Sequence, residues 1–237
     1  MKRLQKLKLV LLTLLILTLT IFNSPQLSAE EASPSLDDGY KYIALTFDDG
    51  PHTANDARIL NALNEVNGQA TFFQVGYSIP YNLKGVKAIL DQGSEIGNHS
   101  YDHPAFTTLS AQGISNQIAW TNNLLQENFE FTPQLVRPPY GDINDAVLAN
   151  LPYPVILWSV DTLDWKYRDP YYVAEQIRSA SAGSIVLLHS IHESTATAVE
   201  MVLEEMYLNG YRFVTVSELF RIYGKTLNPY TIYYSAY

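Results

Sequence analysis

Short apolar runs rich in β-branched and aromatic residues alternate with helical patterns along most of the chain. The predicted strands cover residues 42–46, 70–75, 95–98, 135–137, 155–158, 184–188 and 212–214. The predicted helices cover residues 54–66, 83–91, 111–128, 145–150, 170–180, 195–208 and 216–223. Such an alternation predicts a parallel α/β fold. Because so many units share one stretch of chain, a barrel of seven to eight β/α units is favoured over an open sheet.

The first 29 residues have the layout of a signal peptide. Four Lys and Arg residues within positions 1–8 precede an uncharged run of 14 residues at 9–22, and small residues at 28–29 suit cleavage after Ala29. The run is shorter than the roughly 20 residues that a spanning helix needs. We therefore expect export with cleavage, and an uncleaved N-terminal anchor is the alternative. Either way the protein is expected to be secreted or held at the cell surface.

Three further segments follow the predicted signal. Residues 30–39 are polar with no apolar period and are expected to form a disordered leader, and residues 40–223 form the predicted catalytic domain. Residues 224–237 contain four tyrosines without helical or alternating spacing. We expect this Tyr-rich segment to pack on the outside of the barrel, with a sugar-stacking platform as the alternative.

Charge and cysteine content narrow the function classes. Without residues 1–29 the chain keeps 11 of its 15 Lys and Arg and all 24 Asp and Glu, so its net charge is 11 − 24 = −13. Such acidity argues against a nucleic-acid partner. The chain has no cysteine, so an exported protein of this kind must be stable without disulfides.

All five histidines, His52, His99, His103, His189 and His192, follow predicted strands. In α/β barrels the loops after the strands form the catalytic face. His99 and His103 are four residues apart, a spacing that suits a metal such as zinc but is also often incidental. The paired carboxylates Asp48 and Asp49 end the first strand in TFDDGP, which could equally be a solvated turn.

A metal site needs a third ligand, and Asp49 can complete an Asp-His-His set that leaves a position open for water. Asp48 would then be free to act as a base. Arg137, in RPPYG, could hold Asp48 ionised, and an aspartate of DTLDW could favour the protonated form of His189. Taken singly, the arginine and the aspartates could be ordinary surface residues, and a histidine after a buried strand is usually structural.

Five motifs, TFDDGP, HSYDH, RPPYG, DTLDW and LLH, occur here in the order and spacing of carbohydrate esterase family 4, the polysaccharide deacetylases. The resemblance covers about residues 40–222. It implies a distorted barrel of seven or eight β/α units and one divalent metal ion, zinc or else cobalt. The resemblance also shows one departure, because Ser190 stands where much of the family has aspartate, and we expect this to affect loop geometry only.

The resemblance assigns a role to each motif residue. It makes Asp48 the general base, His189 the general acid, and Asp49, His99 and His103 the metal ligands. Arg137 would orient Asp48, and Asp164 would pair with His189. The residues expected at the substrate are Trp165 and Leu187 around the acetyl methyl group, Tyr140 with its backbone N–H at the oxyanion, and Pro138; Asp161 would have a supporting role.

These roles match the needs of amide hydrolysis, which requires an activated water, charge stabilisation and a proton for the leaving amine. We expect deacetylation of N-acetylglucosamine in peptidoglycan glycan strands, because muramic-directed relatives tend to have arginine at the position of Tyr140. The alternative substrates are muramic acid residues, poly-N-acetylglucosamine, chitin oligomers and acetylated xylan. A different class of function is an inactive polysaccharide-binding domain. We expect a monomer with no membrane contact beyond a possible N-terminal anchor.

Overall fold

The computed structural model describes residues 36–237, so the predicted signal peptide and most of the predicted leader lie outside the described residues. The described residues group into one compact unit. Within the described part of the chain, no helix combines the length and the apolar character needed to cross a membrane. The domain boundaries drawn from the sequence remain a prediction.

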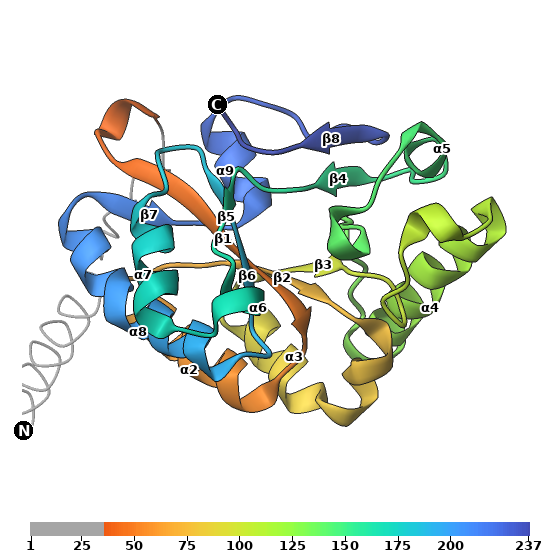
Figure 1. Ribbon diagram of the computed structural model, residues 1–237, viewed down its shortest axis with the longest axis horizontal. Helices are drawn as coiled ribbons and strands as arrows, with labels where there is room; N and C mark the ends of the chain where they lie inside the picture. Colours follow the sequence, from red (N-terminus) through yellow and green to blue (C-terminus); the bar gives the residue numbers. More distant parts are fainter. Residues whose placement is uncertain (1–35) are drawn as a thin grey trace, which may run out of the picture. The chain divides into compact units, whose positions relative to one another are not determined.

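Eight strands and eight α-helices alternate along the described residues, with four short 3₁₀ helices between them (Figure 1). The strands are β1 (Lys41–Gly50), β2 (Thr71–Gln74), β3 (Glu95–Asn98), β4 (Pro154–Ile156), β5 (Val160–Asp161), β6 (Ile185–His189), β7 (Tyr211–Phe213) and β8 (Thr231–Tyr233). The helices are α2 (Thr53–Glu65), α3 (Leu83–Asp91), α4 (Ala111–Phe129), α5 (Asp145–Leu148), α6 (Asp164–Tyr167), α7 (Pro170–Arg178), α8 (Glu193–Leu208) and α9 (Val216–Ile222). The 3₁₀ helices are η1 (Leu36–Asp38), η2 (Gly76–Tyr81), η3 (Phe106–Thr108) and η4 (Pro139–Gly141).

The strands pair in parallel in the order β3-β2-β1-β6-β5, and β7 pairs with the first residues of β1. A second parallel pair, β4-β8, joins this sheet through Val136, which bridges Asn98 on one side and Val155 on the other. An antiparallel bridge between Ser184 and Ser235 joins the segment after β8 to the residue before β6. These pairings close the sheet into a distorted barrel and confirm the predicted fold class.

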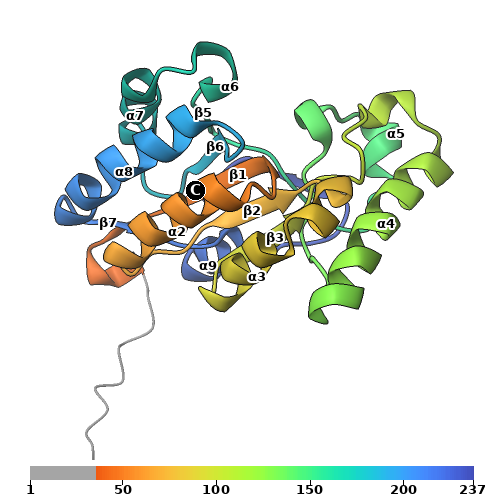
Figure 2. The same ribbon diagram turned by 90° about the horizontal axis from the view of Figure 1, so that it is seen from below.

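Strand β1 is buried on both faces, as a central strand of such a barrel must be. Ile43, Leu45 and Phe47 pack outward in a core shared with α2, α3, α7 and α8. Tyr42 and Ala44 point the other way, into a second core with residues of β4, β6 and α9. Figure 2 shows α2 and α3 side by side in front of the strands, covering one face of the sheet. The carboxyl end of β1 is therefore held from both sides.

The sequence located the main elements but missed three and overestimated one. The predicted strand 135–137 is only the bridge at Val136. The short elements β5 and α6, which carry the DTLDW motif, were not predicted. Strand β8 forms within the Tyr-rich segment, where no strand was expected.

Candidate active site

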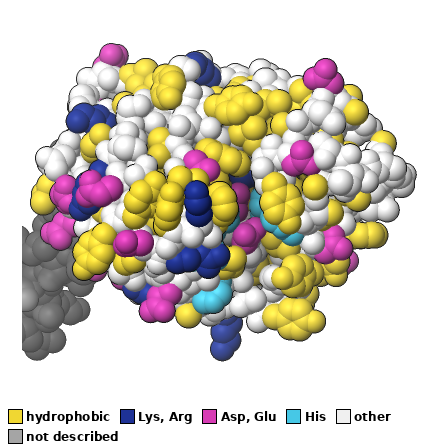
Figure 3. Space-filling model, viewed as in Figure 1, with side chains coloured by type: hydrophobic (Ala, Val, Ile, Leu, Met, Phe, Trp, Pro, Cys, Tyr) yellow, Lys and Arg dark blue, Asp and Glu magenta, His cyan; other side chains and the backbone are white. Residues whose placement is uncertain are grey.

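The carboxyl ends of β1, β3 and β6 meet at one cavity of about 400 Å³. Figure 3 shows histidine side chains in a central hollow, bordered by hydrophobic and acidic side chains. The cavity is lined by Asp48, Asp49, His99, His103, Tyr140, Gly141, Trp158, Asp161, Trp165, Leu187 and His189. We call it the central cavity. It brings together residues from all five sequence motifs.

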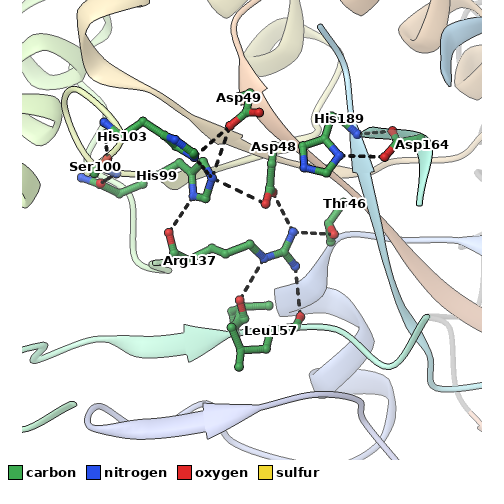
Figure 4. A network of polar contacts seen from close by, with 12 residues as sticks. Thr46, Asp48, Asp49, His99, Ser100, His103, Arg137, Leu157, Asp164 and His189 are labelled. Carbon is green, nitrogen blue, oxygen red and sulfur yellow. Dashed lines mark hydrogen bonds and ion pairs between the residues drawn. The ribbon is translucent and has the colours of Figure 1, made fainter. Parts of the chain in front are cut away.

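Asp49, His99 and His103, called the metal triad here, place three potential ligand atoms within 4.8 Å of one another. His103 Nε2 lies 3.1 Å from Asp49 Oδ1 and 3.3 Å from His99 Nε2. His99 Nδ1 lies 2.7 Å from the carbonyl oxygen of Arg137, which can only accept a hydrogen bond. The His99 proton therefore sits on Nδ1, and Nε2 is left with the lone pair that a metal ion needs. Figure 4 shows both rings turned toward Asp49.

The metal triad suits a divalent ion in both chemistry and charge. Two imidazoles and one carboxylate are the ligand types of catalytic zinc sites. Burial acts to raise the pKa of Asp49, but hydrogen bonds with His103 and His99 outweigh it, and the pKa falls well below its usual range. Asp49 is thus ready as an anionic ligand. The residues present fit a single divalent ion.

Three residues of the site adopt the left-handed backbone conformation that side chains disfavour. Asp49 has φ 66°, His103 has φ 62° and Tyr140 has φ 62°. Such conformations cost free energy and tend to occur where function fixes the side-chain direction. Gly141 follows at φ 63°, and a Cβ atom there would meet the Trp158 ring at 2.7 Å. Only glycine fits at this corner of the cavity.

Arg137 is fully buried and holds Asp48 in place. Its Nη1 donates to Asp48 Oδ1 at 2.7 Å and to Thr46 Oγ1 at 2.8 Å. Its Nε and Nη2 donate to the carbonyl oxygens of Ile156 and Leu157 at 2.9 and 3.1 Å (Figure 4). Burial lowers the pKa of Arg137, although the neighbouring Asp48 raises it. The guanidinium fixes one Asp48 oxygen, and the other lies 3.6 Å from His99 Nε2.

His189 forms a second carboxylate–imidazole pair with Asp164. His189 Nδ1 lies 2.7 Å from Asp164 Oδ1, and the His189 backbone N–H donates to Oδ2 at 2.7 Å. Thr195 Oγ1 also donates to Oδ2 at 2.7 Å. Burial lowers the pKa of His189, but the hydrogen bond and the charge of Asp164 outweigh it, so the pKa is raised. The proton on Nδ1 faces Asp164, which leaves Nε2 as the atom that can exchange a proton with a substrate.

The remaining predicted residues divide between the cavity wall and its surroundings. Leu187, Trp165, Asp161 and Tyr140 line the central cavity, and the Tyr140 ring packs edge-on against His103 at 4.6 Å between centroids. Pro138 is buried and is not among the lining residues, and its carbonyl accepts the N–H of Gly141. Arg137 and Asp164 do not line the cavity; Arg137 hydrogen-bonds to Asp48, and Asp164 hydrogen-bonds to His189.

Several supporting contacts were not predicted from the sequence. Trp158 lines the cavity, and Thr195 completes the hydrogen bonding of Asp164. Arg168 Nε donates to the Trp165 carbonyl at 2.9 Å, and its Nη1 lies 2.9 Å from His192 Nδ1. Arg168 thereby ties the DTLDW loop to the loop that follows His189. No motif pointed to these residues, since each acts through its position in the fold.

Comparison with known proteins adds independent findings. A sequence model of the polysaccharide deacetylase family matches residues 36–155. Peptidoglycan-N-acetylglucosamine deacetylase PgdA of Listeria monocytogenes is 42% identical over 188 residues, 79% of this chain and 40% of the relative. Peptidoglycan-N-acetylmuramic acid deacetylase PdaC of Bacillus subtilis is 38% identical over 186 residues, 78% of this chain and 40% of the relative. The chain thus spans about two fifths of the length of these relatives.

Solved structures share the fold. A structure of PdaC from Bacillus subtilis superposes with a TM-score of 0.76 at 38% identity, covering 79% of this chain and 93% of that chain. A family 4 acetyl xylan esterase from Clostridium thermocellum, in complex with a cobalt ion, superposes with a TM-score of 0.77 at 30% identity. That match covers 82% of this chain and 98% of the esterase.

Proposed function

Because the chain belongs to the polysaccharide deacetylase family, we propose that it hydrolyses N-acetyl groups of amino sugars in a cell-wall polysaccharide. The observation that carries this proposal is the placement of two separate proton-transfer groups on the walls of one cavity. Asp48 with Arg137 stands beside the metal triad, and His189, paired with Asp164, is the register partner of Asp48 on the neighbouring strand β6. A pure binding module has no use for such a pair.

Asp48 is the general base of the proposed reaction. A divalent ion held by Asp49, His99 and His103 would supply Lewis-acid polarisation of the reacting groups when bound. Arg137 fixes Asp48 Oδ1 and leaves Oδ2, near His99, to take a proton from the attacking water. The water oxygen bonds to the acetyl carbonyl carbon as Asp48 receives the proton.

His189 is the general acid that completes the reaction. Asp164 holds the ring through Nδ1, so Nε2 delivers its proton to the sugar nitrogen as the C–N bond breaks. The products are acetate and a free amine on the sugar. The raised pKa of His189 supports this role, since the shift favours the protonated ring that a general acid needs.

The walls of the central cavity suit an acetyl group. Leu187 and Trp165 offer apolar surface for the methyl group, and Tyr140 closes one side. We assign the backbone N–H of Tyr140 to the oxyanion, Asp161 to a supporting position and Pro138 to holding the Tyr140 turn. Neutral aromatic surface also suits a sugar ring.

We propose N-acetylglucosamine of peptidoglycan as the substrate, zinc as the ion and cobalt as an alternative. Similarity to PgdA and the neutral Tyr140 support the substrate, and similarity to PdaC makes muramic acid the second candidate. An extracytoplasmic location follows from such a substrate. Monomeric behaviour and export by the predicted signal belong to the same proposal.

The test is incubation of the zinc-loaded protein with purified peptidoglycan, chitin oligomers and acetylated xylan. Released acetate is measured, and free amines are located on the sugars by mass spectrometry. We expect free amines on glucosamine units and loss of activity with chelator. Asp48→Asn and His189→Gln should each lower kcat by roughly two to four orders of magnitude while the metal content is unchanged. Absence of acetate release from every N-acetylated polymer would contradict the proposal.

A further inference from the structure

Two segments that carry reacting residues are in contact beside the central cavity. One is the turn that follows Asp49, and the other is the loop that follows His189 and begins at Ser190. The Ser190 backbone N–H donates to the Asp48 carbonyl oxygen at 3.3 Å. A Cβ atom added at Gly50 would lie 3.1 Å from Ser190 Oγ, so the two segments pack closely. Their contact therefore lies directly next to both proton-transfer groups.

Asp56, in the first turn of α2, contacts both segments with one carboxylate. The residue is fully buried and lies outside the five sequence motifs. Its Oδ2 accepts the backbone N–H of His52, in the turn after Asp49, at 2.7 Å. Burial raises the pKa of this carboxylate, and its interaction with the Ser190 side chain acts in the opposite direction. The turn and the loop therefore share one buried anchor.

Asn55 holds the backbone of the same loop. Its Nδ2 donates to the Ser190 carbonyl oxygen at 2.8 Å, and the residue is 6% exposed. Helix α2 thus contacts Ser190 through the serine side chain and through its carbonyl group. The packing of α2 in the outward core, which it shares with α8, fixes the helix from which both contacts are made.

The chemistry of the contact suits one carboxylate and not two. A buried carboxylate is stabilised by hydrogen-bond donors, and the His52 N–H and the Ser190 hydroxyl are groups of this kind. An aspartate at position 190, which much of the family has, would place a second carboxylate beside Asp56. Neighbouring like charges oppose each other's ionisation, most strongly where water is excluded. Ser190 and Asp56 therefore match as donor and acceptor.

We propose that Asp56 is a positioning residue of the proposed reaction. Through its contacts with Ser190 and His52, it holds the acid in place relative to the base. The inference rests on the proposed function and extends it to a residue that does not line the central cavity. A displacement of about 1 Å between reacting groups can lower a rate roughly a hundredfold. Substrate binding needs no such alignment, so the loss should fall on kcat and not on KM.

The test measures acetate release from soluble N-acetylated glycan strands of peptidoglycan at about pH 8, where Asp56 is ionised. Asp56→Ala should lower kcat between roughly tenfold and a hundredfold, with KM and zinc content at the parental values. Asp56→Asn should stay within about threefold of the parental kcat, because its amide oxygen still accepts the His52 N–H and its amide N–H can reach the Ser190 hydroxyl. Melting temperature is measured for every variant.

Glu95→Ala is the matched control for a purely structural loss. Glu95 also joins two elements with one carboxylate, since it accepts from Thr71 Oγ1 of β2 at 2.9 Å and from the Ser217 N–H of α9 at 3.2 Å. It is the first residue of β3, whereas the candidate site lies at the carboxyl ends of the strands. Glu95→Ala should lower the melting temperature and keep the parental kcat, KM and zinc content.

Exchange of the two side chains tests the same contact without removing it. Ser190→Asp places two carboxylates together and should lower kcat, and adding Asp56→Ser should recover most of the loss. The inference is overturned by parental kcat in Asp56→Ala, by an equal loss of kcat in Glu95→Ala, or by an exchange variant no more active than Ser190→Asp. If the parent releases no acetate from the strands, the proposed function fails instead.

Discussion

Arg137 serves both halves of the candidate site with different parts of one residue. Its guanidinium binds Asp48, and its carbonyl oxygen binds His99 Nδ1. The position of the base and the orientation of a metal ligand are therefore set by the same residue. Every guanidinium nitrogen has at least one acceptor, as full burial requires.

Replacing Arg137 should cost more stability than an ordinary surface arginine. In Arg137→Met the Asp48 carboxylate stays buried without its partner, and breaking such a pair typically costs about 3–5 kcal/mol. We expect urea unfolding of the metal-free protein to show a loss of this order. Adding Asp48→Asn should recover part of it, because the unpaired charge disappears. Purely additive losses in the double variant would argue against the pair as the cause.

The His189–Asp164 pair predicts a pH effect on catalysis. Burial lowers the pKa of His189 and Asp164 raises it, so Asp164→Asn should lower that pKa. His189 must be protonated to act as an acid, so the basic limb of the kcat/KM profile should move to lower pH. Asp161→Asn is the matched control, because Asp161 lines the cavity but bonds the Leu163 N–H instead. A basic limb that stays in place in Asp164→Asn would contradict this reading.

At the scale of elements, the first residues of α2 form hydrogen bonds with His52, in the turn that follows Asp49. His52 is the N-cap, and its Nδ1 accepts the Asn55 N–H at 3.3 Å. Asp56 reaches back and accepts the His52 N–H at 2.7 Å. This reciprocal arrangement resembles a capping box and fixes the chain directly after Asp49.

The buried Asp56 should make stability fall as pH rises. Burial raises its pKa from the usual 3.8 to about 6, so between these values the folded state binds more protons than the unfolded state. Ionisation above this window costs about 3 kcal/mol of folding free energy. Asp56→Asn cannot ionise and keeps an acceptor for His52. Its unfolding free energy should therefore exceed that of the parent increasingly from pH 4 to 6.5, and parallel pH curves would refute the assignment.

The sequence predicted those elements in which a hydrophobic pattern repeats over several residues. These were β1, α4 and α8, together with the motif residues at the ends of strands. Val136 is a single bridging residue, and β5 has two residues, so neither gives a periodic signal. Strand β8 depends on pairing with β4, a contact far away in sequence. Thr195 was missed for the same reason, since only the closed fold brings it to Asp164.

At the scale of the whole molecule, the C-terminal segment closes the barrel. The Tyr233 carbonyl accepts the Leu157 N–H at 2.8 Å, and the Ala236 N–H donates to the Gly183 carbonyl at 2.8 Å. Tyr233 also packs against Phe220 of the second core, the one that contains Tyr42 and Ala44. Residues 233–236 therefore link the residue after β4 to the turn before β6.

Deleting residues 231–237 should expose the edge of β4 and part of the second core. An uncovered edge strand invites pairing with other chains, so we expect a lower melting temperature and aggregation near it. Thermal melting followed by light scattering measures both. Removal of Tyr237 alone, which is 65% exposed, is the control and should have little effect. A truncated protein that melts like the parent would show that the barrel closes without β8.

The left-handed backbone conformation at Asp49, His103 and Tyr140 lowers the stability of the folded protein. Each such residue costs on the order of 1 kcal/mol or more, against a total stability of roughly 5–15 kcal/mol for a typical domain. Glycine at His103 or Tyr140 would relax the chain while destroying what the side chain provides. Directed evolution that screens only for folded, heat-resistant protein should therefore select glycine at these two positions and yield stable but inactive variants. A screen that also measures deacetylation would retain His103 and Tyr140.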